Sequence, residues 1–308
     1  MTQDSILSMN LGESQTLKQD RSADSAVRKT GSAAGRIKPA ARARESRIAD
    51  AFIPKGSIST RSYVTLAIAS FGVIFLLWCF ACYVLKVDSM FLPSPARVLK
   101  SAVTLITVNN FALDVRMSVQ RVLIGFAVSA LVGIPLGLLI GTYAPIAAWF
   151  EPLFSFSRYL PASAFIQLFI LWIGIGESSK IAIIIVGSLA QIILMTATNV
   201  RNVSVSLIEV SYTLGVSRGG VFWKVILPKA MPDIMDTLRM VLGWAWTYII
   251  VAEMIGASQG VGFMITQAGR QFMISKIFVG IITIGLIGLG LDMMMLYLKK
   301  ALFPWNEE

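Results

Sequence analysis

Histidine is absent from the 308 residues of the chain, and charged side chains make up only 14% of them. Without histidine the sequence lacks the commonest general base and the commonest metal ligand, which rules out zinc chemistry and a Ser/His/Asp active site. The two cysteines, Cys79 and Cys82, lie inside the apolar run FLLWCFACYVL, where packing is favoured over thiolate redox chemistry. No G-x-x-x-x-G-K-[ST] phosphate loop occurs, so any ATP must bind to another chain.

Apolar residues dominate instead: 56% of the chain is hydrophobic, and the mean hydropathy is +0.72. A water-soluble domain of this size is far more polar, so the sequence predicts an all-α integral membrane protein. A spanning helix takes about 20 apolar residues. Six such segments follow one another in a single membrane domain, residues 63–298, and their predicted bounds are 63–85, 119–141, 160–175, 181–200, 239–257 and 277–298.

Both ends of the chain are polar. Residues 1–62 carry eleven Lys and Arg against six Asp and Glu and have no sustained apolar period, which predicts a disordered basic tail. A solvated tail that fixes orientation is the simplest interpretation, and an arm that binds nucleic acid or lipid is the alternative. With the N-terminus inside, the cytoplasmic segments hold 19 Lys and Arg and the opposite side holds 7. The positive-inside rule therefore predicts that both termini, including a C-terminal tail at 299–308, are cytoplasmic.

Glycine and proline interrupt two of the apolar segments. Gly133, Gly137 and Gly141 lie at four-residue spacing in the second span, which favours close approach of another helix. Three prolines cut the following stretch into an interfacial segment and a short third span. They are Pro145, Pro152 and Pro161. Short, broken membrane helices are where transporters place their pathways.

The loop between the fourth and fifth spans has the most specific pattern. Ser206 and Glu209 form an S-x-x-E capping box, which predicts the start of a short helix. Gly215 fits the left-handed position that ends this helix. Ser217 is predicted to cap a second short helix, which Pro228 ends. The result is a compact helix–turn–helix at the membrane surface that carries three aromatic residues, Tyr212, Phe222 and Trp223.

Glu209, Gly215 and the V-I-L-P of residues 225–228 resemble the E-A-A-x-x-x-G-x(9)-I-x-L-P motif of permease subunits of ATP-binding-cassette (ABC) importers. Three residues depart from the motif but keep size or branching: Val210, Ser211 and Val225. The segments FLPSP, GIPLGLLIG, RYLPASAF and VAEMIGASQGVG resemble more narrowly the nitrate, sulfonate, taurine and bicarbonate branch of these permeases. The resemblance implies a six-span type I importer permease fold, with a cytoplasmic coupling helix in the loop 204–232.

The resemblance also implies the partners and their roles. The permease would pair with itself in the bacterial inner membrane, in contact with lipid, with two ABC ATPase subunits on the cytoplasmic side and a periplasmic solute-binding protein on the other. ATP and Mg would bind to the ATPase subunits, so this chain is expected to be no enzyme, to hold no cofactor and to bind no nucleic acid. The residues expected to couple the chain to the ATPase are Glu209, Tyr212, Gly215, Phe222, Trp223, Leu227 and Pro228.

The translocation pathway is expected between the third and fifth spans. Its candidate residues are Arg121, Gln167, Arg239, Trp246 and Glu253. Gln167 stands where the resembling branch usually has proline, and its amide is either a helix–helix hydrogen bond or a pathway group. Glu253 either pairs across helices or faces a water-filled cavity, and Asp292 is expected to be solvated at the cytoplasmic face.

The expected substrate is a small anion such as nitrate, bicarbonate or taurine, and the alternative is a heterocyclic vitamin precursor that stacks on Trp244 or Trp246. A self-sufficient channel or ion-coupled carrier is a second class of function. It would need coupling charges within the spans, where the sequence offers only Glu253 and Asp292, with Arg121 near one end. An intramembrane protease is excluded because the chain has neither histidine nor a nucleophile motif.

Overall fold

The computed structural model describes residues 59–305. The chain divides into two compact units, Met1–Ile74 and Phe75–Glu308. The described part of the first unit is the beginning of helix α3, Thr60–Tyr83, which corresponds to the predicted first span. The predicted disordered tail, residues 1–62, therefore lies almost entirely outside the described residues.

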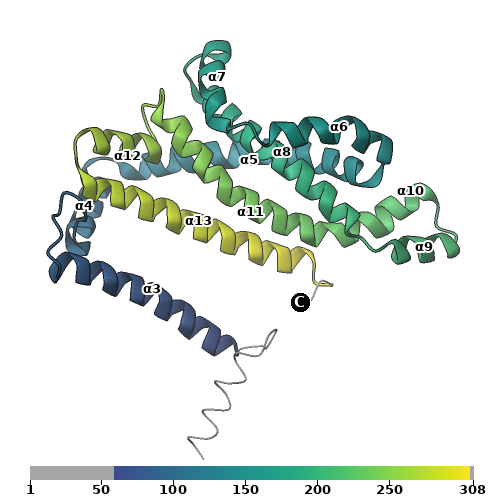
Figure 1. Cartoon of the computed structure of the whole chain (residues 1–308), viewed down its shortest axis with the longest axis horizontal. Coiled ribbons are helices and arrows are strands. Elements are labelled where there is room, and N and C mark those ends of the chain that lie inside the picture. Colours follow the sequence, from purple (N-terminus) through teal and green to yellow (C-terminus); the bar gives the residue numbers. More distant parts are fainter. Residues whose placement is uncertain (1–58, 306–308) are drawn as a thin grey trace, which may run out of the picture. The chain divides into compact units, whose positions relative to one another are not determined.

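The second unit is helical throughout its described part, with no strand between residues 75 and 305 (Figure 1). Its helices are α4 (Pro95–Val108), α5 (Phe111–Thr142), α6 (Ala144–Ser157), α7 (Ile166–Ile173), α8 (Glu177–Arg201), α9 (Val205–Thr213), α10 (Arg218–Val221), α11 (Leu227–Met254), α12 (Val261–Arg270) and α13 (Ile274–Leu302). A 3-10 turn, Ala162–Phe165, precedes α7, and a π-helical turn, Phe222–Ile226, joins α10 to α11.

Within residues 59–305, five helical stretches are long and apolar enough to cross a membrane. A sixth span results if α6 and the segment Ala162–Ile173 are counted together, although they bend by 85°. The predicted third span, residues 160–175, corresponds to the segment Ala162–Ile173, which is short and counts as a span only together with α6. Pro161 lacks the N–H that would extend a preceding helix, and Gly174 ends α7 after eight residues with φ at +90°.

Helices α5, α8 and α11 lie side by side and enclose the main core (Figure 1). The glycine stripe of α5 faces α8, because a Cβ placed on Gly137 would lie 2.6 Å from Cβ of Thr196, and one on Gly133 would lie 2.8 Å from Cγ2 of Ile192. The close helix approach predicted from this stripe is confirmed. Ile184, like Ile192, is fully buried between these helices, so α5 and α8 form the rigid centre of the unit.

Two helices begin well before the spans that hydropathy predicts. Helix α5 starts at Phe111 instead of residue 119, and α11 starts at Leu227 instead of residue 239. The added turns of α11 contain charged residues that lower the local hydropathy, yet they leave the backbone hydrogen bonding of the helix intact. Helix α11 therefore extends beyond its apolar segment toward the loop 204–232.

Candidate functional site

The loop 204–232 contains two short helices, but the first does not begin as predicted. Helix α9 has Ser204 at its N-cap, and Ser206 lies inside its first turn. No side chain caps this helix, so the predicted Ser206–Glu209 capping box is wrong. A second serine, Ser204, lies two residues upstream, and its backbone is non-helical with φ −56° and ψ 128°, so the helix begins there.

The turn between the two short helices follows the prediction. Gly215 has φ at +80°, and its N–H donates to the carbonyl of Tyr212 at 2.9 Å. A Cβ at this position would meet no atom within 4 Å, but any other residue would be strained at this positive φ. The hydroxyl of Ser217 accepts a hydrogen bond from the N–H of Gly220 at 3.3 Å, so Ser217 caps α10 as predicted.

Pro228 does not end the second helix, which corrects the prediction. The chain continues from α10 through the π-helical turn into α11, so that Arg218–Met254 is one helical stretch of 37 residues. Proline is compatible with this position because Pro228 lies in the first turn of α11, where the wider π turn before it changes the hydrogen-bonding register. The short helices are therefore joined directly to a membrane span.

The surface of this loop is apolar. We define the coupling surface as its exposed large apolar side chains: Val205, Leu207, Val210, Tyr212, Leu214 and Trp223. Glu209 and Gly215 are also exposed, whereas Phe222, Leu227 and Pro228 are half-buried beneath the surface. The rings of Phe222 and Trp223 stand perpendicular with centroids 5.1 Å apart, so the exposed tryptophan rests on a packed phenylalanine. A patch of exposed apolar groups of this kind is typical of a docking site.

A buried charge network lies near the other end of α11. Arg121 is 2% exposed and Glu253 is 1% exposed, and Nη1 of the arginine is 2.6 Å from Oε1 of the glutamate. The same guanidinium donates to Glu177 at 2.8 Å and to the carbonyl of Gln259 at 2.8 Å. Lys180, also buried, pairs with Glu177 at 3.0 Å. Arg121 therefore joins α5 to both α8 and α11.

Backbone and hydroxyl donors complete the network. The carboxylate of Glu253 accepts from Oγ of Ser118 at 2.7 Å and from the N–H of Gly262 at 2.8 Å, and Ser118 in turn accepts from the N–H of Val261 at 2.9 Å. A Cβ on Gly260 would collide with this carboxylate, and its φ of +131° requires glycine. The network thus anchors the turn between α11 and α12. Arg121, Lys180 and Glu253 are buried and the side chain of Glu177 is 49% exposed. The positive and negative charges of the network are equal in number and paired with one another, which does not favour an ion-coupled carrier.

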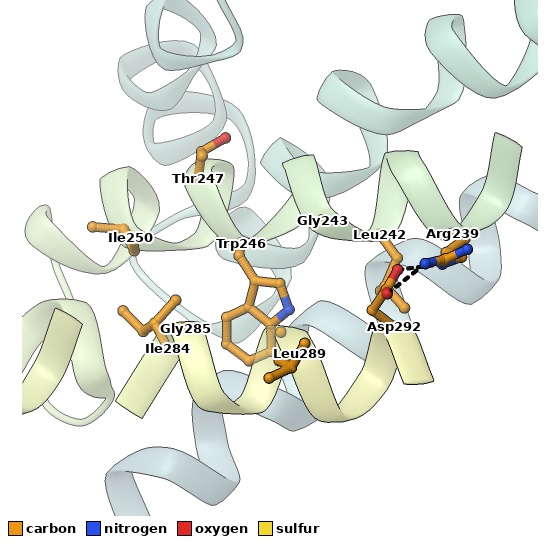
Figure 2. A pocket seen from close by; sticks show the side chains of 11 residues that line it. Arg239, Leu242, Gly243, Trp246, Thr247, Ile250, Ile284, Gly285, Leu289 and Asp292 are labelled. Carbon is orange, nitrogen blue, oxygen red and sulfur yellow. Dashed lines mark hydrogen bonds and ion pairs between the residues drawn. The ribbon is translucent and has the colours of Figure 1, made fainter. Parts of the chain in front are cut away.

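A groove of about 310 Å³ lies between α11 and α13. Figure 2 shows the indole of Trp246 standing in it, with Arg239 and Asp292 joined at one end. The Arg239–Asp292 pair links α11 to α13, and both side chains are about one-third exposed. Asp292 therefore remains accessible to solvent, as expected, but also has an ion-pair partner that was not predicted. Gly285 and Gly288 of α13 form part of the opposite wall.

The five predicted pathway residues therefore occupy three different places. Arg121 and Glu253 belong to the buried network, and Arg239 and Trp246 line the groove. Gln167 lies in the middle of the segment Ala162–Ile173, where it is exposed. Ser118, Glu177 and Lys180 belong to the site but were not predicted as site residues. The E-S-S-K spacing of Glu177 and Lys180 at the start of an apolar segment is the one local signal for them, because it places both on one helix face.

Long apolar helices around a buried core, with a short helical loop that extends one of them, are typical of a multi-pass membrane protein. The family described as "Binding-protein-dependent transport system inner membrane component" matches residues 133–304. The chain belongs to this family.

Similar proteins agree with this assignment. The chain is 32% identical over 251 residues to the taurine transport system permease protein TauC of Escherichia coli, which covers 80% of this chain and 91% of that protein. It is 30% identical over 226 residues to the nitrate import permease protein NrtB of Synechocystis, covering 70% and 82% respectively. Its fold resembles that of an inward-facing methionine ABC transporter, MetNI, with a TM-score of 0.50 and 20% identity over 58% of this chain and 91% of that chain.

The chain is thus the permease subunit of an ABC importer in the inner membrane, with the fold of a type I importer permease. It is not an enzyme, because ATP hydrolysis in such importers belongs to separate ATPase subunits. Its partners are accordingly an ABC ATPase and a substrate-binding protein.

Proposed function

We propose that this permease imports a small anion: nitrate, bicarbonate or a short sulfonate such as taurine. The observation that carries the proposal is the similarity, over 70% or more of the chain, to permeases named for taurine and for nitrate. Cationic side chains support it, since Lys and Arg exceed Asp and Glu on the side opposite the predicted cytoplasmic face. Screening at physiological salt acts within about 8 Å, so this excess makes only a modest contribution to anion approach.

Coupling to ATP hydrolysis would act through the coupling surface. Exposed apolar groups on short helices suit insertion into a groove of a partner, in the way that an amphipathic helix docks. Two copies of the permease would each present one such surface to one of two ATPase subunits, which hold ATP and Mg. Closure of the ATPase pair would draw the two surfaces together, and the continuous helix from Arg218 to Met254 would carry that movement into the membrane.

For this coupling the loop 204–232 must lie in the cytoplasm, together with both termini. The Lys and Arg count of 19 against 7 supports that orientation. Single cysteines at Ser94, Ser217 and Ser258, in a chain without Cys79 and Cys82, test it with a membrane-impermeant thiol reagent. We expect labelling from outside at Ser94 and Ser258 only, and external labelling of Ser217 would overturn the orientation.

The substrate is tested with the complete importer, which consists of this chain, its ATPase and its binding protein, in proteoliposomes. Labelled nitrate, bicarbonate and taurine are compared with a labelled heterocyclic vitamin precursor, each with its cognate binding protein. We expect ATP-dependent uptake of at least one anion and none of the heterocycle. Uptake of the heterocycle alone would refute the anion proposal while leaving the permease assignment intact.

A further inference from the structure

One buried donor in the groove between α11 and α13 has no partner. Trp246 is 4% exposed, and its Nε1 is closed to water and makes no hydrogen bond within the described residues. Buried polar groups are almost always hydrogen-bonded, because an unpaired one costs free energy. Figure 2 shows this nitrogen on the side of the indole that faces the Arg239–Asp292 pair. An acceptor that enters the groove would satisfy it once the neighbouring side chains shift enough to expose this nitrogen.

Arg239, at the end of the groove, also has a hydrogen-bond donor that is not used among the described residues. Arg239 binds Asp292 through Nε and Nη2, which leaves Nη1 without a partner in the described part of the chain. Its side chain is 33% exposed, so a ligand can reach it. Indole and guanidinium N–H groups donate only, and together they suit a negatively charged group with several acceptor oxygens.

The rest of the groove is apolar and open. A Cβ placed on Gly243, Gly285 or Gly288 would meet no atom within 4 Å, so these three glycines border empty space rather than a packed neighbour. The cavity of about 310 Å³ lies at the lower end of the range for small-molecule sites. An inorganic ion would leave the apolar wall uncovered, whereas a short carbon chain would cover it.

We propose that this groove is a binding site for a small organic anion, whose sulfonate or carboxylate oxygens accept hydrogen bonds from Arg239 and from Nε1 of Trp246, and whose carbon chain lies against Gly285 and Gly288. The inference rests on the proposed anion import. It narrows the range of proposed substrates, because it favours a sulfonate over nitrate as the molecule held inside the permease.

The test measures binding and uptake separately. Butanesulfonate is titrated calorimetrically into the permease–ATPase complex in lipid nanodiscs, with butanol as the uncharged control, and uptake of labelled taurine is followed in proteoliposomes of the complete importer. Gly288→Leu fills the groove, and Trp246→Phe removes the indole N–H but keeps a ring. Gly290→Leu is the matched control, because Gly290 lies on the same helix, also borders open space and does not line the groove.

We expect the wild type to bind butanesulfonate but not butanol, and Gly288→Leu to weaken that binding about tenfold or more through loss of the contact area. Trp246→Phe should weaken it severalfold, and Gly290→Leu should leave it unchanged. Equal binding by the wild type, Gly288→Leu and Trp246→Phe would overturn the site even if anions are imported. Native mass spectrometry of Gly288→Leu provides two further results that would contradict the anion site, each in combination with unchanged butanesulfonate binding. The first is the loss of a bound phospholipid, and the second is the dissociation of paired permeases. Failure of the wild type to import any anion would instead refute the proposed function.

Discussion

Replacement of Glu253 by alanine is predicted to destabilise this permease severely. The glutamate oxygens accept hydrogen bonds from Nη1 of Arg121 at 2.6 Å, from Oγ of Ser118 at 2.7 Å and from the N–H of Gly262 at 2.8 Å. All three donors would lose an acceptor in a place that water does not reach, since Glu253 is 1% exposed and Arg121 is 2% exposed. The guanidinium would keep only its bonds to Glu177 and to the carbonyl of Gln259.

The expected magnitude follows from the burial of the pair. Removing one partner of a buried ion pair costs about 3–5 kcal/mol. We expect this range here because Arg121, although it keeps Glu177, loses a buried acceptor together with Ser118 and the N–H of Gly262. One kcal/mol corresponds to roughly 2–4 °C in melting temperature for a chain of 150–250 residues. Glu253→Ala should therefore lower the melting temperature by roughly 6–20 °C. Glu253→Gln keeps the volume and one carbonyl acceptor, so its effect should be intermediate.

The matched control is an exposed ion pair. Glu151 and Arg201 approach to 2.6 Å, but their side chains are 37% and 42% exposed. Such a pair contributes about 0–1 kcal/mol, so Glu151→Ala should lower the melting temperature by no more than about 4 °C. Thermal unfolding of the purified variants in one detergent, at one scan rate, provides the comparison. If Glu253→Ala melted as close to the wild type as Glu151→Ala does, the assignment of the network as a buried anchor would be refuted.

Two glycines give further predictions. Gly215→Val should reduce substrate-stimulated ATP hydrolysis and uptake while the permease still inserts into the membrane. A β-branched residue at φ +80° costs on the order of 1–2 kcal/mol and deforms the turn. The control is Gly219→Val, which should leave both activities near normal because Gly219 borders open space and has no positive φ. Gly137→Val should lower the melting temperature by several degrees, because its Cβ would lie 2.6 Å from Cβ of Thr196, and an unchanged melting curve would contradict close packing of α5 on α8.

Local features of the fold could be predicted from the sequence because each depends on a few neighbouring residues. The apolar segments, the left-handed turn at Gly215 and the α10 cap at Ser217 are of this kind. The start of α9 was predicted two residues late, because the S-x-x-E spacing to Glu209 favours Ser206 as the cap, whereas the backbone path places the N-cap at Ser204. Pro228 was predicted to end a helix because a π turn has no sequence signature that would show how the chain accommodates it.

The site residues were harder to predict because their contacts are distant in sequence. Ser118 and Glu253 are 135 positions apart, and no local pattern brings them together. Helix α12 was not predicted, since ten amphipathic residues between two spans are too short for a hydropathy signal. The groove was recognised only in part: Arg239 and Trp246 were candidates, but the glycines of α13 that give it its open wall are indistinguishable in sequence from packing glycines.

Helix α11 connects the coupling surface, the groove and the network, and its attachments differ in strength. The stretch Arg218–Met254 carries Trp223 near its beginning and Glu253 near its end. At that end the buried network holds it to α5 and α8, and such a network is costly to break. Its polar links to α13 are two partly exposed ion pairs, Arg239–Asp292 and Asp236–Lys299, which water can replace at little cost. A displacement applied at the coupling surface therefore changes the contact between α11 and α13 before it disrupts the network, so a movement driven by the ATPase would reach the groove while the turn between α11 and α12 stays fixed.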